Sequence, residues 1–118
     1  MRRHLIALTL AAALIGGAAA QPAAAATVIK GTLTMSGYRW QPKTESVAKG
    51  AKVTWKAVQG KHTVTAWKGP WTKDATINQG QSTSFTFTKA GTYKFRCRFH
   101  STLVNGVCSG MCGTVTVG

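Results

Sequence analysis

The sequence predicts an all-β domain, a β-sandwich or a barrel, and three observations lead to this prediction. Short stretches alternate between apolar and polar residues; within residues 52–57, for example, Val53, Trp55 and Ala57 are apolar and their neighbours are polar. Turn signals recur about every 8 to 12 residues, and in no stretch do apolar residues recur with the period of an α-helix. Many short, half-buried strands separated by turns indicate a sandwich or a barrel.

Seven strands are expected, most of them bounded by glycine-containing turns. They cover residues 28–35, 45–49, 52–57, 62–67, 82–88, 93–97 and 114–117. Residues 71–78 are expected to be irregular, Met35 is expected in the core, and the four tryptophans in the core or at sheet edges. Tyr93, Phe95 and Cys97 alternate with basic residues, so the thiol of Cys97 is expected on the inward face of its strand.

Residues 1–26 are expected to be a secretory signal peptide, which leaves residues 27–118 as a single domain. A basic start that contains Arg2 and Arg3 precedes an apolar run from Leu5 to Ala20 and a cleavage site of small residues. A membrane anchor is the alternative, but this run is shorter than the roughly 20 residues that span a bilayer. The export route, general or twin-arginine, stays open. The mature protein is therefore expected outside the cytoplasm, in the periplasm, the cell wall or the medium.

The chain is strongly basic, with 15 Lys and Arg against 2 acidic residues and a formal net charge of +13 at pH 7. Without the two arginines of the predicted signal peptide, the net charge is about +11. Such a field attracts acidic proteins. The candidates for a basic rim that docks an acidic redox partner are Lys56, Lys61, Arg96 and Arg98; a solvated basic surface is the alternative. Nucleic acid is not expected as a partner, and the mature protein is expected to be a monomer that does not span a membrane.

Four side chains form a candidate copper site: His62, Cys97, His100 and Met111. His62 begins a predicted strand, whereas Cys97 and His100 form a Cys-x-x-His pair at the end of another, and Met111 precedes the last strand. Copper that cycles between two oxidation states suits a soft thiolate, two imidazoles in the same plane and a distant Met sulfur. The sequence therefore predicts that these residues hold one copper ion.

The segments around these residues resemble the copper-binding region of plastocyanin-like cupredoxins, the family of blue type 1 copper proteins. The similar segments are Gly91–His100, Gly110–Val117, and Val53–Trp55 followed by His62–Val64. The resemblance extends over roughly residues 37–117 and implies a Greek-key β-sandwich or barrel of about seven or eight strands. It also implies a mononuclear type 1 copper site that transfers single electrons, with His100 as the ligand nearest the surface and the usual exit for the electron.

The sequence departs from this family between His100 and Met111. Ten residues, Ser101 to Gly110, separate the two, where plastocyanin-like members have far fewer. The insertion contains Asn105-Gly106, a turn signal. The longer loop is expected to alter access to His100, and whether it still lets Met111 act as the axial ligand is left open.

The mature chain has three cysteines, so one thiol stays unpaired if a disulfide forms. Export favours disulfides, and Cys108 and Cys112, four residues apart, are expected to pair. Such a bridge would pin the enlarged loop and hold Met111 in place. It would also leave Cys97 as the free thiolate that copper requires.

The predicted function is that of an exported carrier that passes single electrons between redox partners. One alternative is a copper-binding or copper-delivery protein of the same fold without a redox circuit. The other is a structural zinc module, since four N and S ligands suit tetrahedral zinc, but it leaves His62 without a role. Its ligands would be Cys97, His100, Cys108 and Cys112. An enzyme is not expected, because the only carboxylates, Glu45 and Asp74, lie far from the motif and protein ligands fill the metal positions.

Overall fold

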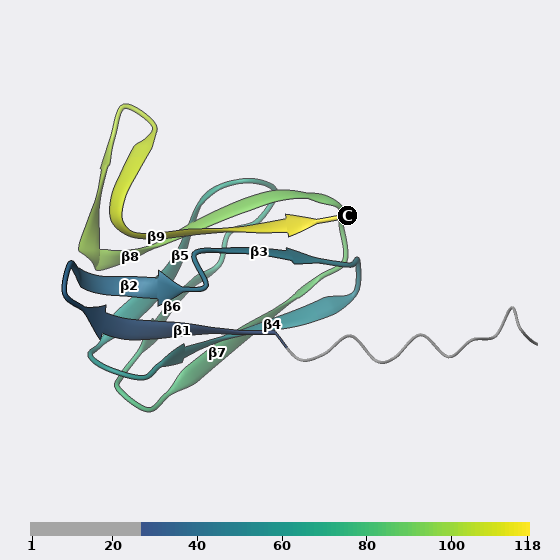
Figure 1. The fold of residues 1–118 in the computed structure, drawn as a ribbon. Coiled ribbons are helices and arrows are strands. Elements are labelled where there is room, and N and C mark those ends of the chain that lie inside the picture. The colour runs from purple at the N-terminus through teal and green to yellow at the C-terminus, as the bar shows by residue number, and fades with distance from the viewer. Residues whose placement is uncertain (1–26) are drawn as a thin grey trace, which may run out of the picture.

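The computed structural model describes residues 27–118 as nine β-strands in two packed sheets (Figure 1). In the four-stranded sheet the order is β2 (Gly37–Gln41), β1 (Thr27–Thr34), β4 (Ala51–Ala57) and β7 (Ser82–Phe87). In the five-stranded sheet the order is β3 (Thr44–Val47), β9 (Val107–Val117), β8 (Gly91–Val104), β5 (His62–Lys68) and β6 (Asp74–Ile77). The predicted signal peptide lies outside the described residues.

Both sheets are mixed, and their pairings confirm the predicted β-sandwich. The pairs β1–β4 and β3–β9 are parallel, and the other neighbouring strands are antiparallel. Chain order and sheet order differ, because β1 lies between β2 and β4, and β8 pairs with β5. The part of the chain that the structure describes contains no helix that is long and apolar enough to cross a membrane.

The core between the sheets is rich in aromatic side chains, as the alternation predicted. In β4, Val53 and Trp55 are fully buried, and their polar neighbours face outward. Trp55 packs edge-on against Phe95 of the opposite sheet, with the ring centroids 5.3 Å apart. Trp71, expected in the core or at a sheet edge, is partly buried and packs against Trp55 and Tyr93 of this core. Edge-to-face contacts of this kind add to the free energy that burial contributes.

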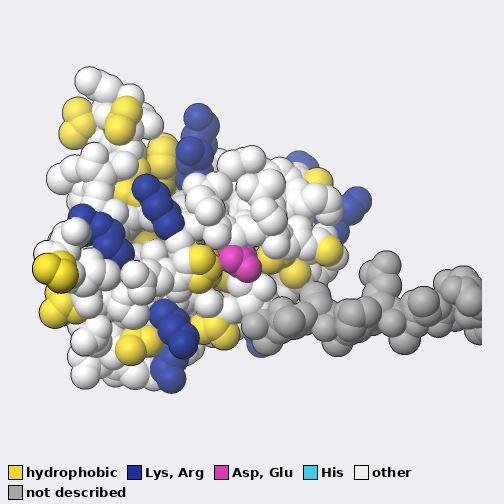
Figure 2. Space-filling view, in the orientation of Figure 1, with side chains coloured by type: hydrophobic (Ala, Val, Ile, Leu, Met, Phe, Trp, Pro, Cys, Tyr) yellow, Lys and Arg dark blue, Asp and Glu magenta, His cyan; other side chains and the backbone are white. Residues whose placement is uncertain are grey.

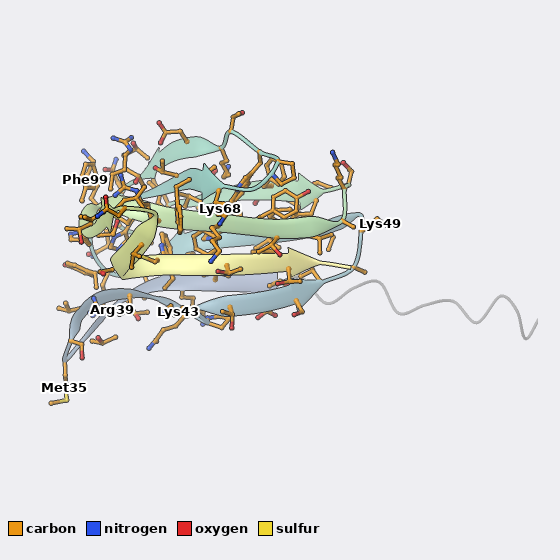
Figure 3. The ribbon with its side chains drawn as sticks, turned by 90° about the horizontal axis from the view of Figure 1, so that it is seen from above. Met35, Arg39, Lys43, Lys49, Lys68 and Phe99 are labelled. Atoms are coloured by element: carbon orange, nitrogen blue, oxygen red, sulfur yellow. A yellow bond between two sulfur atoms is a disulfide. The ribbon has the colours of Figure 1, made fainter. Side chains whose placement is uncertain are left out.

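Two short strands were not predicted, and one residue predicted in the core is exposed. Strand β6 lies within residues 71–78, which were expected to be irregular; Ile77 is the one buried residue in this strand, so no alternation marks it. Strand β2 was not expected either, although Trp40 is buried in it. Met35, expected in the core, is fully exposed in the turn between β1 and β2 and points away from the sheets (Figure 3).

The insertion between His100 and Met111 is a β-hairpin rather than a loop. Strands β8 and β9 continue beyond the sandwich as a ribbon, with Ser101 paired to Gly110 and Val104 paired to Val107. Asn105 and Gly106 form the turn with φ values of 50° and 73°, which suit a tight two-residue hairpin. Figure 1 shows this hairpin, called the arm and defined as residues 101–110, projecting from one end of the sandwich.

Gly113 of β9 lies in a tightly packed contact with β8. It pairs with Phe95, and a Cβ atom at Gly113 would lie 2.3 Å from the Phe95 ring and 2.9 Å from the backbone oxygen of Lys43. We predict that Gly113→Ala lowers the free energy of unfolding by about 1 to 3 kcal/mol, because the buried ring must shift. Gly118→Ala, where a Cβ meets open space, is the control. Equal denaturation midpoints for the two variants would contradict the prediction.

Candidate metal centre

The pairing of β5 with β8 brings the distant histidine to the cysteine. Thr65 pairs with Arg96 in this antiparallel ladder, so the start of β5 lies beside the residues that follow Arg96. The backbone nitrogen of Thr63 donates a hydrogen bond to Cys97 Sγ at 3.4 Å. As a result, His62, at the first position of β5, meets Cys97 although 34 residues separate them in the sequence.

A break in the β8–β9 ladder brings the other candidate ligands together. The regular pairing ends at Arg96 with Cys112 and resumes at Ser101 with Gly110. Between these pairs, residues 97–100 of β8 face a single residue of β9, which is Met111. An irregularity of this kind redirects side chains, and here it lets Cys97 and His100 gather at one point. Because the arm leaves from this break and returns to it, the ten inserted residues do not carry Met111 away.

The donor atoms of His62, Cys97 and His100 form a compact triangle. The Nδ1 atoms of the two histidines are 3.3 Å apart. Cys97 Sγ lies 3.4 Å from Nδ1 of His100 and 3.8 Å from Nδ1 of His62. Among residues 27–118, these three are the one group of His, Cys, Asp and Glu side chains placed to hold a metal ion. Donors about 2.0 to 2.3 Å from a central ion and spread evenly in a plane lie roughly 3.5 to 3.8 Å apart, so the triangle fits one ion.

Most of the centre is shielded from solvent. His62, Cys97 and Met111 have no exposed surface, whereas His100 is half-buried. The other ring nitrogen of His62, Nε2, donates to the backbone oxygen of Gln59 at 2.5 Å, which turns Nδ1 toward the cysteine. A hydrogen bond on the far side of a ligand imidazole fixes its orientation and tautomer.

The environment keeps both imidazoles neutral near neutral pH. Burial lowers the pKa of His62 below its usual 6.5; the hydrogen bond to Gln59 opposes this and the charge of His100 adds to it. Burial also lowers the pKa of His100. Since a metal binds the neutral imidazole, both side chains are in the form that can bind at neutral pH.

Two residues of the centre were not found from the sequence. Gly31 lies against it, because a Cβ atom there would be 2.8 Å from Cδ2 of His62 and 3.0 Å from Cε of Met111. The ring of Tyr38 packs against both histidines, with centroid distances of 5.0 Å to His62 and 4.4 Å to His100. Neither stands near the ligands in the sequence. The parallel β1–β4 pairing and the β1–β2 hairpin bring Gly31 and Tyr38 to the centre, and no local sequence pattern predicts either contact.

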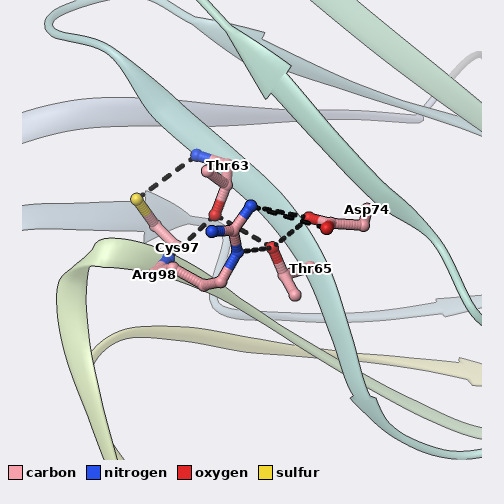
Figure 4. Close-up of polar contacts among 5 residues, drawn as sticks. All are labelled: Thr63, Thr65, Asp74, Cys97 and Arg98. Atoms are coloured by element: carbon pink, nitrogen blue, oxygen red, sulfur yellow. Dashed lines mark hydrogen bonds and ion pairs between the residues drawn. The ribbon is translucent and has the colours of Figure 1, made fainter.

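A hydrogen-bonded network holds the strand that carries the thiol (Figure 4). The hydroxyl of the buried Thr63 accepts a hydrogen bond from the backbone nitrogen of Arg98 at 2.8 Å and one from the hydroxyl of Thr65 at 2.9 Å. Arg98 also forms an ion pair of 3.1 Å with Asp74. Thr65 and then Arg98 lower the pKa of Asp74 below 3.8 through hydrogen bonds, partly offset by burial. Thr63 thus holds both the sulfur of Cys97 and the backbone of the residue that follows it, which limits movement of the sulfur.

The residues predicted as a basic rim are spread over different contacts. Lys61 lies over the ring of Phe99 at 5.9 Å, and Arg96 donates to the hydroxyl of Ser101. Arg98 is engaged with Asp74, and the exposed Lys56 lies on β4, in the other sheet. Lys61 is therefore the one of these four whose charged group lies over Phe99, the exposed residue that precedes His100.

The structure joins Cys108 and Cys112 in the expected disulfide and leaves Cys97 free and buried. Cys108 lies in the arm, where it pairs with Leu103, and Cys112 lies in the sandwich part of β9. The bridge therefore ties the arm to the sheet on either side of Met111. It also removes two of the four ligands that a zinc module would need.

Fold and site together define the class of this protein, a β-sandwich with one buried His-His-Cys centre for a soft metal and a Met beside it. The donor set suits copper, as the sequence predicted. A family described as the cupredoxin-like domain matches residues 5–108 of the chain. The chain therefore belongs to the cupredoxin family. No curated protein sequence shows significant similarity to it.

Solved structures of copper proteins share this fold. A mutant of amicyanin in the reduced Cu(I) form is 27% identical, with a TM-score of 0.63, and the match covers 84% of this chain and 88% of that chain. Pseudoazurin from Methylobacterium extorquens is 22% identical, with a TM-score of 0.63 and coverage of 78% and 74%. A purple cupredoxin from Nitrosopumilus maritimus is 20% identical, with a TM-score of 0.61 and coverage of 78% and 99%. The latter two show the fold alone.

A thiol count tests the pairing of the cysteines. We predict one reactive thiol per chain when the metal-free protein is labelled in denaturant without reductant, because Cys97 is the free cysteine. Reduction before labelling should raise the count to three, since it opens the Cys108–Cys112 bridge. Three reactive thiols before reduction would contradict the pairing.

Proposed function

We propose that residues 27–118 form an exported electron carrier that holds one copper ion in a type 1 site and exchanges single electrons with redox proteins. The ligands would be His62, Cys97 and His100 in one plane, with Met111 as the weaker axial ligand. A copper ion bound there supplies a centre that changes between Cu(II) and Cu(I) by one electron. Every other part of the function depends on how the protein holds these donors.

The observation that carries the proposal is the triangle of donor atoms, with edges of 3.3, 3.4 and 3.8 Å. Hydrogen bonds of the surrounding protein hold His62 and the strand of Cys97, so these donors need little rearrangement when the charge of the ion changes. Two histidines, one thiolate and a distant thioether suit both oxidation states of copper. Met111 is fully buried, and its side chain and that of His62 both border Gly31, which supports the axial role.

The route for the electron follows from burial. His62 and Cys97 are closed off by the sandwich, and His100 is the partly exposed member of the triangle. Electrons would therefore pass through the edge of His100. Catalysis is not proposed, because the group of metal-binding side chains found within residues 27–118 consists of His62, Cys97 and His100 and holds no carboxylate that could act as an acid or base.

A copper-delivery role remains the second candidate, because it would use the same ligands. It predicts easily released copper and slow electron exchange between copies of the protein, whereas a carrier predicts tight binding and fast exchange. The zinc module is disfavoured by the disulfide, which uses Cys108 and Cys112, and by the position of His62 within the triangle.

Export, a monomeric state and an acidic redox partner complete the proposal. Export is supported by the signal-peptide pattern of residues 1–26 and by the disulfide, which persists in oxidising compartments. The partner is suggested by the basic surface: Figure 2 shows Lys and Arg side chains spread over one face of the domain. A large positive net charge also opposes self-association.

Copper titration tests the type of site. We predict that adding Cu(II) to the metal-free domain produces an intense blue colour, with one equivalent bound, and that Cys97→Ser abolishes the colour because the band needs the thiolate. His62→Ala should also lose it. The measurement is visible absorption and electron paramagnetic resonance. A colourless copper complex of the native protein, or zinc affinity unchanged in His62→Ala, would refute the proposal.

Replacing Met111 tests the axial ligand. Met111→Leu should keep the blue colour, because the trigonal donors remain, but should raise the reduction potential. The lost sulfur donates electron density that favours Cu(II), so its removal favours Cu(I). Met35→Leu is the matched control, since Met35 is fully exposed in the β1–β2 turn. Equal potentials for the two variants, measured by voltammetry, would rule out Met111 as a ligand.

A further inference from the structure

The arm presents apolar side chains to solvent next to the metal centre. Leu103, Val104 and Val107 are 39%, 62% and 63% exposed, and Phe99 at the foot of the arm is 52% exposed. Single exposed apolar residues are common, but three on one projecting element and a fourth at its foot indicate an interaction surface. In Figure 2 the projecting arm carries yellow hydrophobic side chains, and dark-blue basic side chains lie around its foot.

Two hollows in the surface flank the arm. The first, the basic cleft, has a volume of about 260 Å³ and lies between the arm and strands β5, β8 and β9. Its lining includes Lys43, Trp67, Lys94, Val107 and the Cys108–Cys112 disulfide. The second, the His100 hollow, has a volume of about 390 Å³ and opens beside the metal centre. Its lining is Phe99, His100, Ser101, Thr102, Ser109 and Gly110.

The basic cleft carries positive charge that the protein itself does not neutralise. Lys94 Nζ is held 5.6 Å from the centroid of the Trp67 ring, so its ammonium group has a defined position. Within residues 27–118, the one ion pair joins Arg98 and Asp74, and no acidic residue lines the cleft. Lys43 and Lys94 are therefore available to carboxylates from another molecule.

We propose that the arm and the two hollows form the docking surface for an acidic redox protein, an inference that rests on the proposed electron-carrier function. Carboxylates of the partner enter the basic cleft, and an apolar part of its surface covers Val104 and Val107. This places the partner's redox centre over the His100 hollow. One electron then passes from the reduced partner to Cu(II), which yields the oxidised partner and Cu(I), with no atom or proton transferred.

The observations favour this occupant over two others. A second copy of the chain does not fit, because each copy carries a net charge of about +11 and the two repel at close range. A lipid surface would explain the apolar tip and the positive charge. It would not explain why the arm rises beside His100, the half-buried ligand, with the basic cleft on its other side.

The test measures how fast two c-type cytochromes of similar potential, one acidic and one basic, reduce the Cu(II) form in stopped flow. The native protein should react faster with the acidic cytochrome, and this advantage should shrink as ionic strength rises. The small reductant hexaammineruthenium(II) reports on the copper centre without protein docking. Equal rates with both cytochromes at low ionic strength would overturn the proposal.

Two double variants separate docking from the copper site. Lys43→Gln with Lys94→Gln should slow the acidic cytochrome about threefold to tenfold at low ionic strength, because the steering charge is lost. Lys52→Gln with Lys56→Gln is the matched control, since it removes the same charge from exposed positions of β4 in the other sheet. Equal slowing in both variants would mean that net charge alone acts, and the cleft would be excluded.

Val104→Ser with Val107→Ser tests the apolar part of the surface. It should slow the acidic cytochrome about tenfold, because these side chains would form the buried centre of the complex. The blue colour and the rate with hexaammineruthenium(II) should not change. A rate with the cytochrome equal to the native rate, or slowing with both reductants, would exclude the arm as a docking element.

Two further outcomes keep the proposals distinct. If the copper-loaded protein is not blue and reacts with neither the cytochromes nor hexaammineruthenium(II), the electron-carrier function fails. Calorimetric titration of the metal-free domain with the acidic cytochrome then tests docking alone. If the Lys43/Lys94 variant binds the cytochrome as tightly as the native protein, the docking proposal is overturned. A second outcome is that the native protein sediments with phosphatidylglycerol vesicles and the Val104/Val107 variant does not, while the acidic cytochrome reduces both at the same rate. In that case the arm binds membranes and the docking proposal is wrong.

Discussion

The metal centre depends on the antiparallel pairing of β5 with β8. This pairing brings the first residue of β5 to the end of the regular β8–β9 ladder, where the chain must depart from strand geometry. Four residues then face one, and three donor side chains converge within hydrogen-bonding distances of one another. The aromatic core fixes the two sheets relative to each other, so the geometry of the centre is a consequence of how the sandwich packs.

The layers around the donors restrict their movement in different ways. A backbone carbonyl orients His62, a glycine lets β1 approach both His62 and Met111, and Tyr38 covers the two imidazoles. Behind the thiol, Thr63 connects the backbone of β5 to that of β8. Restraint of this kind is what a single-electron centre needs, because reorganisation of the ligands opposes transfer.

The arm shows how an insertion can be added without disturbing such a centre. The arm begins and ends at paired positions of the ladder, Ser101 and Gly110. The distance in space between His100 and Met111 therefore does not increase with the number of residues in the arm. The disulfide connects the arm to the sheet. The arm changes the surface instead, because it exposes apolar side chains and its residues line part of both hollows.

The sequence alone determined the fold class, the inward direction of Cys97 and the soft character of the donor set, because period-two alternation and ligand chemistry are local properties. It could not supply β2 or β6, since short strands with one buried side chain leave no periodic signal. It also could not show that Met35 lies just beyond the end of β1, in an exposed turn. Nor could it show that ten residues fold into a ribbon that returns Met111 to the thiol, or that Gly31 and Tyr38 border the site. Those results depend on pairings between distant strands, and tertiary packing decides which strands meet.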